Sequence, residues 1–168
     1  MPDGKYVSID TNGNKVEEQA INSSAGAADS DKVIRTNASG VIDSTFLPGI
    51  EGVTLTASEA LDAGDLVNIW DDSGTASMRK ADASGSKPAD GFVLTSVSMG
   101  STGVVYGEGK LTGLSGLTIG TTQYLSDSTP GDVTETPVTT SGNILQKVGR
   151  AASATTIVFE RGEPITRA

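Results

Sequence analysis

From residue 53 onward, the chain consists of short segments rich in Val, Ile and Thr that are separated by glycine-containing turns. β-Branched residues favour strands, and a spacing of about 8–12 residues between strands is typical of antiparallel barrels and sandwiches. We therefore predict an all-β fold, a small antiparallel β-barrel or β-sandwich with an extended N-terminal arm. Helix is limited to a turn or two near residues 16–21 and 58–61. The predicted strands are residues 53–56, 66–70, 76–81, 91–98, 103–108, 123–126, 133–136, 144–149 and 155–160.

Residues 1–50 are predicted to form an extended arm with short β-turn units, ahead of a β-barrel or β-sandwich domain at residues 51–168. An Asn-Gly pair at residues 12–13 is a strong hairpin signal. Residues 33–43 repeat its design, with an apolar pair on each side of a Thr-Asn turn. Between these two turn units, residues 20–30 are small and polar and show neither a helical nor a strand period, which indicates an extended linker.

The chain of 168 residues contains neither histidine nor cysteine. It therefore lacks the commonest general base near neutral pH, the commonest metal ligand and the strongest side-chain nucleophile. Disulfides and Cys/His zinc sites are excluded as well. We expect a non-catalytic protein, so no residue is assigned to catalysis, to a cofactor or to a metal.

Composition also limits the partners that the chain can take. Aromatic residues make up 4% of the chain, so a core must be built from Val, Ile, Leu and Ala, and chains poor in core residues often complete their burial through subunit contacts. The net charge of −9 leaves no basic stripe for phosphate contacts, so nucleic acid is not an expected partner. No apolar run approaches the roughly 18 residues of a membrane helix, and the N-terminus shows no secretory signal, so no membrane contact is expected.

Two carboxylate pairs, Asp71 with Asp72 and Asp62 with Asp65, offer an enzymatic alternative. Two carboxylates alone can catalyse glycoside hydrolysis. However, each pair lies in a glycine-containing turn, where Asp is favoured because it hydrogen-bonds to nearby backbone, and Trp70 is the only tryptophan for sugar stacking. We prefer the structural interpretation; a polysaccharide-degrading activity abolished by Asp71→Asn or Asp72→Asn would support the glycosidase.

Two further segments resemble ligand-binding loops but lack the residues that bind. Residues 107–113 fail as a phosphate loop, because Val104 replaces its first glycine and Leu111 its Ser or Thr. Residues 10–14 begin like a calcium loop, but the glycine at the sixth position and the glutamate at the twelfth are missing. We predict a bulged or kinked strand for the first segment and a hairpin turn for the second.

Several stretches along the chain are similar to a signature of phage structural proteins. The first two read Gly26-Ala27-Ala28-Asp29-Ser30-Asp31-Lys32-Val33-Ile34 and Gly40-Val41-Ile42-Asp43-Ser44-Thr45-Phe46-Leu47-Pro48. The others are residues 56–69, 89–94, 114–120 and 123–126. Taken together, they make the chain resemble virion proteins of the capsid cement and head-fibre families, and collars of tail fibres.

The resemblance implies a capsid decoration protein: a small β-domain, typically a homotrimer, on the outer capsid surface, where it bridges major capsid protein subunits. It further implies a virion protein made in the bacterial cytoplasm, whose N-terminal arm reaches across the shell or a sister subunit. We expect arm contacts from Tyr6, Val7, Ile9, Phe46, Leu47 and Ile50. We expect Trp70 and Phe92 to pack the β-domain or the trimer seam.

Two alternatives remain open. Phe46 and Leu47 precede a Pro-Gly stop and need an apolar surface, which the chain's own β-domain provides as readily as a neighbouring subunit. At the level of function, the alternative is a phage fibre or head-fibre module that binds host surfaces or glycans. A fibre shaft usually has heptads or a regular β-repeat and an adhesive tip usually exposes aromatic residues, and neither is evident in the sequence.

Overall fold

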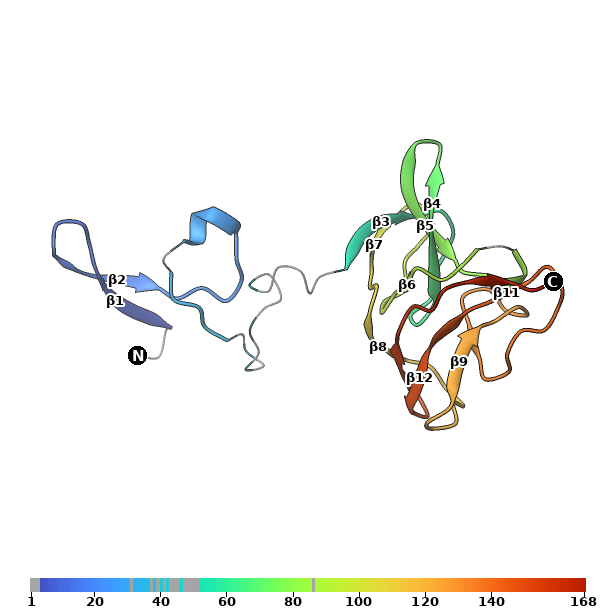
Figure 1. Cartoon of the computed structure of the whole chain (residues 1–168). Helices are drawn as coiled ribbons and strands as arrows, with labels where there is room; N and C mark the ends of the chain where they lie inside the picture. The colour runs from blue at the N-terminus through green and yellow to red at the C-terminus, as the bar shows by residue number, and fades with distance from the viewer. Residues whose placement is uncertain are drawn as a thin grey trace. The chain divides into compact units, whose positions relative to one another are not determined.

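The computed structural model of the chain describes residues 4–30, 32–36, 38, 40, 42, 46, 52–85 and 87–168. The chain divides into two compact units, Met1–Glu51 (unit 1) and Gly52–Ala168 (unit 2) (Figure 1). Among the described residues there are strands and short 3₁₀ turns but no α-helix, which confirms the predicted all-β class.

Unit 1 contains a hairpin of β1 (Lys5–Ile9) and β2 (Lys15–Gln19), followed by the 3₁₀ turn η1 (Gly26–Asp29). The Asn-Gly hairpin is confirmed: Gly13 has a φ of 83°, and Asp10 Oδ1 accepts hydrogen bonds from the amides of Asn12 and Asn14 at 2.9 and 2.8 Å. The prediction of a helical turn near residues 16–21 is wrong, because most of that segment lies in β2 and pairs with β1. Farther along, Ile21 forms a single parallel bridge with Ile34.

The first sheet of unit 2 is a nearly closed barrel. Its five strands lie in the order β6-β4-β5-β3-β7, with all neighbours antiparallel except β3 and β5. Phe92 and Tyr106 then exchange backbone hydrogen bonds of 3.0 and 2.9 Å, and this bridge joins the two edges of the sheet. The strands are β3 (Val53–Ala57), β4 (Leu66–Asp72), β5 (Thr75–Lys80), β6 (Gly91–Phe92) and β7 (Thr102–Val105).

The second sheet of unit 2 is fully antiparallel, with the order β10-β9-β12-β13-β8. A separate antiparallel pair, β11 and β14, and the 3₁₀ turn η3 (Ala83–Gly85) complete the unit. The predicted small antiparallel barrel or sandwich is thus confirmed with one exception, the parallel pairing of β3 and β5. The remaining strands are β8 (Gly109–Thr112), β9 (Thr122–Leu125), β10 (Val133–Thr134), β11 (Ile144–Leu145), β12 (Lys147–Ser153), β13 (Thr156–Phe159) and β14 (Ile165–Thr166).

Both core clusters lie in unit 2. The larger combines side chains from both sheets, and each fully buried Leu, Ile or Phe contributes roughly 1.5–3 kcal/mol. At its centre the ring of Phe92 lies 5.7 Å from that of Tyr106 and 5.2 Å from that of Phe159. The larger cluster is Leu66, Ala81, Ala83, Ala89, Phe92, Leu111, Leu125, Val138, Ile144, Val148, Ala151, Ile157 and Phe159. The smaller is Ala57, Leu61, Val67, Met78, Val93, Val97 and Val105.

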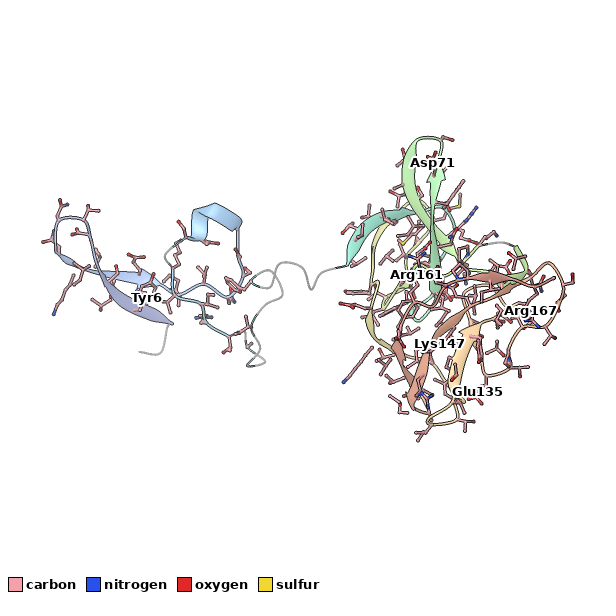
Figure 2. The ribbon with its side chains drawn as sticks, in the orientation of Figure 1. Tyr6, Asp71, Glu135, Lys147, Arg161 and Arg167 are labelled. Carbon is pink, nitrogen blue, oxygen red and sulfur yellow. The ribbon has the colours of Figure 1, made fainter. Side chains whose placement is uncertain are left out.

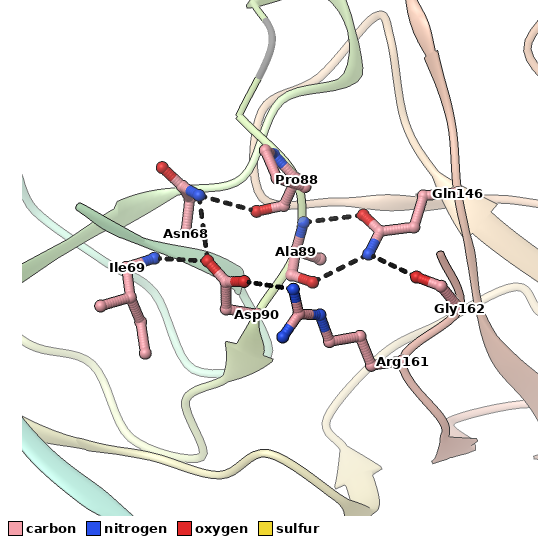
Figure 3. A network of polar contacts seen from close by, with 8 residues as sticks. All are labelled: Asn68, Ile69, Pro88, Ala89, Asp90, Gln146, Arg161 and Gly162. Atoms are coloured by element: carbon pink, nitrogen blue, oxygen red, sulfur yellow. Dashed lines mark hydrogen bonds and ion pairs between the residues drawn. The ribbon is translucent and has the colours of Figure 1, made fainter. Parts of the chain in front are cut away.

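A polar network ties the segment before β6 to both sheets (Figure 3). The fully buried Gln146 side chain accepts from the amide of Ala89 at 2.8 Å and donates to the carbonyls of Ala89 and Gly162 at 2.9 and 3.0 Å. On the other side of the segment, Asp90 accepts from Asn68 at 3.0 Å and pairs with Arg161 at 3.1 Å. The two sheets are therefore joined by buried hydrogen bonds as well as by apolar packing.

Candidate interaction surfaces and a polar cavity

The two faces of the β1–β2 hairpin differ. Because side chains alternate along a strand, Tyr6, Ser8 and Glu18 lie on one face. There the Tyr6 hydroxyl donates to Glu18 Oε2 at 3.0 Å and the Ser8 hydroxyl to Glu18 Oε1 at 2.5 Å. These hydrogen bonds, Ser8 foremost, and the charge of Lys32 lower the pKa of Glu18 below its ordinary value. This face therefore holds an ionised carboxylate in a local network (Figure 2, with Tyr6 labelled).

The opposite face of the hairpin, here called the open face, carries Lys5, Val7 and Ile9 opposite Gln19, Glu17 and Lys15. The side chains of Val7 and Ile9 are 54% and 71% exposed. Lys5 Nζ lies 3.2 Å from Glu17 Oε1 beside them, in an exposed ion pair. Exposed apolar side chains with a charged rim are typical of contact surfaces.

The described residues of unit 1 bury almost no apolar surface. Among its described residues Ala20 is the one buried hydrophobic side chain. Larger apolar side chains of the same unit are exposed: Val7, Ile9, Val16, Val33, Ile34 and Ile42. An isolated two-stranded hairpin is marginally stable in water, so the apolar side chains of unit 1 remain available to a partner.

The other predicted arm contacts are only partly described. Phe46 is half-buried. Leu47 and Ile50 lie outside the described residues. Of the six predicted arm contacts, Tyr6, Val7 and Ile9 are therefore the ones that the structure brings together on one strand.

Trp70 and Phe92 occupy different environments. Phe92 is 1% exposed and lies in the core between Tyr106 and Phe159. Trp70 is half-buried, and its Nε1 donates to Ser58 Oγ at 3.2 Å. The Arg79 guanidinium stacks over the Trp70 ring at 4.6 Å, a favourable cation–π contact. Phe92 thus packs the β-domain, while part of Trp70 remains accessible on β4.

The two carboxylate pairs make local contacts, Asp71 with a turn amide and Asp62 and Asp65 with Lys80. Asp71 and Asp72 were predicted to lie in a turn, but both belong to the end of β4 in the projecting β4–β5 hairpin, because they pair with β5. Asp71 Oδ1 accepts from the amide of Gly74 in the turn at 2.7 Å (Figure 2). Asp65 and Asp62 lie 3.0 and 3.6 Å from Lys80 Nζ. Burial opposes the charge on Lys80, but its hydrogen bond and attraction to Asp65, and then to Asp62, raise its pKa above the ordinary value. No group of three or more His, Cys, Asp or Glu side chains able to hold a metal occurs among the described residues.

The glycine-rich segment at residues 107–113 lies mostly in β8, which pairs with β13 along its whole length. Gly109 and Gly113 have φ values of 116° and 88°, so the strand begins and ends with conformations that favour glycine. This arrangement agrees with the predicted kinked strand and provides no phosphate loop.

A polar cavity of about 490 Å³ opens in unit 2, and it was not predicted from the sequence. It is lined by the turn before β4 (residues 63–65), the loop after β8 (residues 113–117), Gln123 of β9 and residues 131–135. Three of these segments lie within residues 113–135, whereas residues 63–65 come from a distant part of the chain.

Glu135 and Gln123 both line this cavity; Glu135 is labelled in Figure 2. Glu135 Oε1 accepts from the Thr118 amide at 2.5 Å, the Thr121 hydroxyl at 3.1 Å and Gln123 Nε2 at 3.4 Å. The Thr118 amide is the main reason that the pKa of Glu135 is lowered. Gln123 is fully buried, and its Oε1 is the only buried side-chain oxygen or nitrogen without a hydrogen-bond partner among the described residues.

Comparison with known proteins assigns no family to the chain. No protein-family model matches it, and no curated protein matches it. In the part of the chain that the structure describes, no helix has the length and apolar character needed to cross a membrane. The proposed function therefore depends on the residues of the chain and on the resemblance drawn from its sequence.

Proposed function

We propose that the chain is a bacteriophage capsid decoration, or cement, protein that binds the outer capsid surface and stabilises contacts between major capsid protein subunits. It acts as a homotrimer without catalysis, and its partners are the major capsid protein and sister copies. The observation that carries this proposal is the lack of an apolar core in unit 1, whose described residues bury Ala20 alone while Val7 and Ile9 are exposed.

The composition of unit 1 supports attachment rather than independent folding. Folded segments with too little core gain stability from contacts with a partner. The open face supplies apolar side chains, and among the described residues β1 and β2 form a two-stranded sheet, to which a strand of a neighbouring protein can add. Such an arm docks on a protein surface without requiring a pocket.

Unit 2 supports the proposal in a different way. Its two sheets share the larger core cluster, in which Phe92 and Phe159 are buried. This packing makes unit 2 a rigid domain to which the arm is attached. Ligands that bind only one state stabilise that state by mass action. A subunit that binds only the expanded shell therefore stabilises it, and many copies with small interfaces suffice together.

The first experiment measures the oligomeric state by size-exclusion chromatography with light scattering, followed by co-sedimentation with expanded, undecorated capsids and with precursor shells. We expect a stable trimer that pellets with expanded shells only. A monomer that ignores both kinds of shell contradicts the proposal and favours the fibre-module alternative.

Variants then test the open face. Ile9→Ser, combined with Val7→Ser, removes apolar contact area and is expected to raise the Kd for the shell at least tenfold, which corresponds to about 1.4 kcal/mol. Val158→Ser is the matched control, because Val158 is 50% exposed on β13 of unit 2. Equal binding by both variants would show that the open face is not the attachment surface.

A further inference from the structure

We propose that Asn12, in the loop between β1 and β2, is a site of spontaneous covalent modification whose rate is set by opening of the hairpin (Figure 1). The reaction converts the side-chain amide into a carboxylate and needs only this chain and water. Asn12 is exposed and directly precedes Gly13. Its side chain makes no hydrogen bond to a described residue, whereas Asn14 Nδ2 donates to Asp10 Oδ2 at 3.2 Å.

The chemistry is an attack of the Gly13 backbone nitrogen on Cγ of Asn12. The nitrogen loses its proton, forms a bond to Cγ and expels the side-chain nitrogen as ammonia, which leaves a five-membered cyclic imide. Water then adds to either carbonyl of the ring and opens it, so the products are aspartate and isoaspartate. Glycine favours the attack because it has no Cβ beside the nitrogen, and Asn-Gly occurs once in the chain.

The folded turn restrains this reaction. The Gly13 amide donates to the Asp10 carbonyl at 3.0 Å, so the attacking nitrogen is engaged in the hydrogen bond of the turn itself. The Asp10 carboxylate also accepts from the backbone amides of Asn12 and Asn14 at 2.9 and 2.8 Å. These bonds fix the backbone on both sides of Asn12, so ring closure requires the turn to open.

Opening of this turn costs little free energy. Among the described residues β1 and β2 form a two-stranded sheet, and such a hairpin is marginally stable in water. The hydrogen bonds of Tyr6 and Ser8 to Glu18 hold its strands together on one face. Marginal segments open locally far more often than the whole protein unfolds, so the rate of modification reports how often the hairpin opens.

The isoaspartate product disrupts the hairpin. It routes the backbone through the former side chain, and the extra backbone atom moves the Gly13 and Asn14 amides away from Asp10. The turn that sets the pairing of Ile9 with Lys15 is thereby lost. The consequence for attachment rests on the proposed function: a modified copy no longer presents the open face on a paired strand.

The test is incubation of the full-length protein at mildly alkaline pH, with and without urea, followed by peptide mapping with mass spectrometry. We expect Asn12 to react at least about tenfold faster than Asn22, which is also exposed but precedes Ser23. Isoaspartate is expected among the products, and the reaction should be slower without urea. The proposal is overturned if Asn12 reacts no faster than Asn22, or if urea leaves its rate unchanged.

Two variants test the restraint by the hairpin. Glu18→Ala removes the acceptor of Tyr6 and Ser8, away from the reacting atoms, and should accelerate the modification of Asn12 roughly threefold. Glu17→Ala is the matched control, because Glu17 contacts only the exposed Lys5, and it should leave the rate unchanged. Equal rates in the two variants would contradict the role of hairpin opening.

A third variant tests the consequence for the fold. Asn12→Gln keeps an amide but would require a larger ring, so it should not react on the same timescale. After prolonged incubation, the NMR amide shifts of β1 and β2 should move toward those of a disordered chain in the unmodified sequence and stay unchanged in Asn12→Gln. The same loss in both proteins would overturn the proposal. The capsid-binding experiment uses freshly purified protein, so its outcome is independent of these results.

Discussion

Two fully buried glutamines of unit 2 differ in how completely they are hydrogen-bonded. Gln146 makes three side-chain hydrogen bonds, to the amide and carbonyl of Ala89 and to the carbonyl of Gly162 (Figure 3). Gln123 has a bonded Nε2 but an unpaired Oε1. The same substitution at the two positions therefore removes very different amounts of hydrogen bonding.

We predict that Gln146→Leu lowers the free energy of unfolding by roughly 3 kcal/mol, because it leaves three buried backbone groups without partners. Gln123→Leu should cost less, roughly 1 kcal/mol, because it removes an unpaired acceptor together with its hydrogen bonds. Urea denaturation followed by circular dichroism measures both values. Equal losses would mean that the network at Ala89 does not hold the two sheets together.

The lowered pKa of Glu18 predicts that the hairpin is destabilised at acid pH. Its folded-state pKa is lowered, chiefly by the Ser8 hydroxyl and then by Tyr6, relative to an ordinary value of 4.5. A lowered folded pKa adds stability above the unfolded pKa, and this stability is lost as the pH falls through the folded pKa. The hairpin should therefore loosen as the pH falls from 4.5 downward.

The amide shifts of β1 and β2, followed by NMR during an acid titration, measure this loss. Glu18→Gln should remove most of the change in these amide shifts as the pH is lowered from neutral. Glu17→Gln, on the open face, is the matched control and should retain it, since Glu17 contacts only the exposed Lys5. An unchanged acid response in Glu18→Gln would assign the effect to another group.

At the level of elements, the backbone conformation of β12 requires glycine at position 149. Gly149 has a φ of 147°, and a Cβ added there would lie 2.2 Å from the Val158 carbonyl oxygen of β13. The pairing of β12 with β9 shifts register between Lys147 and Gly149, as in a β-bulge. The bulge therefore requires both the unusual φ and the missing side chain.

We predict that Gly149→Ala destabilises unit 2 by roughly 2–4 kcal/mol through strain and overpacking. Gly107→Ala is the matched control, because nothing lies within 4 Å of its added Cβ and its φ is not in the positive range; its effect should stay within about 0.5 kcal/mol. Thermal and urea unfolding measure the difference. Similar stabilities of the two variants would contradict the role of the bulge.

The elements that the sequence predicted are those specified locally. The Asn-Gly turn determines the β1–β2 hairpin, and the β-branched residues favour β3, β4 and β13. Residues 91–98 were predicted as one strand, but only Gly91 and Phe92 are in β6, because the segment turns away after its bridge to Tyr106. The parallel pairing of β3 and β5 was not predictable, since neither strand has a residue pattern that distinguishes parallel from antiparallel neighbours.

The candidate sites were likewise predictable only where their features are local in the sequence. The exposed apolar residues of β1 were predictable because their alternation and the adjacent turn are local features. The polar cavity was not, because Gln123 reads as an ordinary strand residue and its neighbours Glu135 and Leu114 come from other segments. Burial of Phe92 rather than Trp70 also depended on packing, since both aromatic residues lie in predicted strands.

At the scale of the whole molecule, apolar burial is concentrated in unit 2. All members of both core clusters belong to residues 57–159, and Gln146 is hydrogen-bonded to Ala89 of the larger cluster. Among the described residues of unit 1, Ala20 is the only buried apolar side chain. A segment of this length without a core rarely folds alone, so the stability of the chain in solution resides in unit 2.

We predict that a fragment of residues 52–168 unfolds cooperatively with a melting temperature within roughly 4 °C of the full chain. A peptide of residues 1–51 should show no cooperative transition, because its described residues form only a two-stranded sheet, which is marginally stable by itself. Calorimetry and circular dichroism on the three proteins test both expectations. A much lower melting temperature of the fragment would mean that unit 1 contributes to the core. A cooperative transition in the peptide would remove the physical reason for which the arm needs a capsid partner.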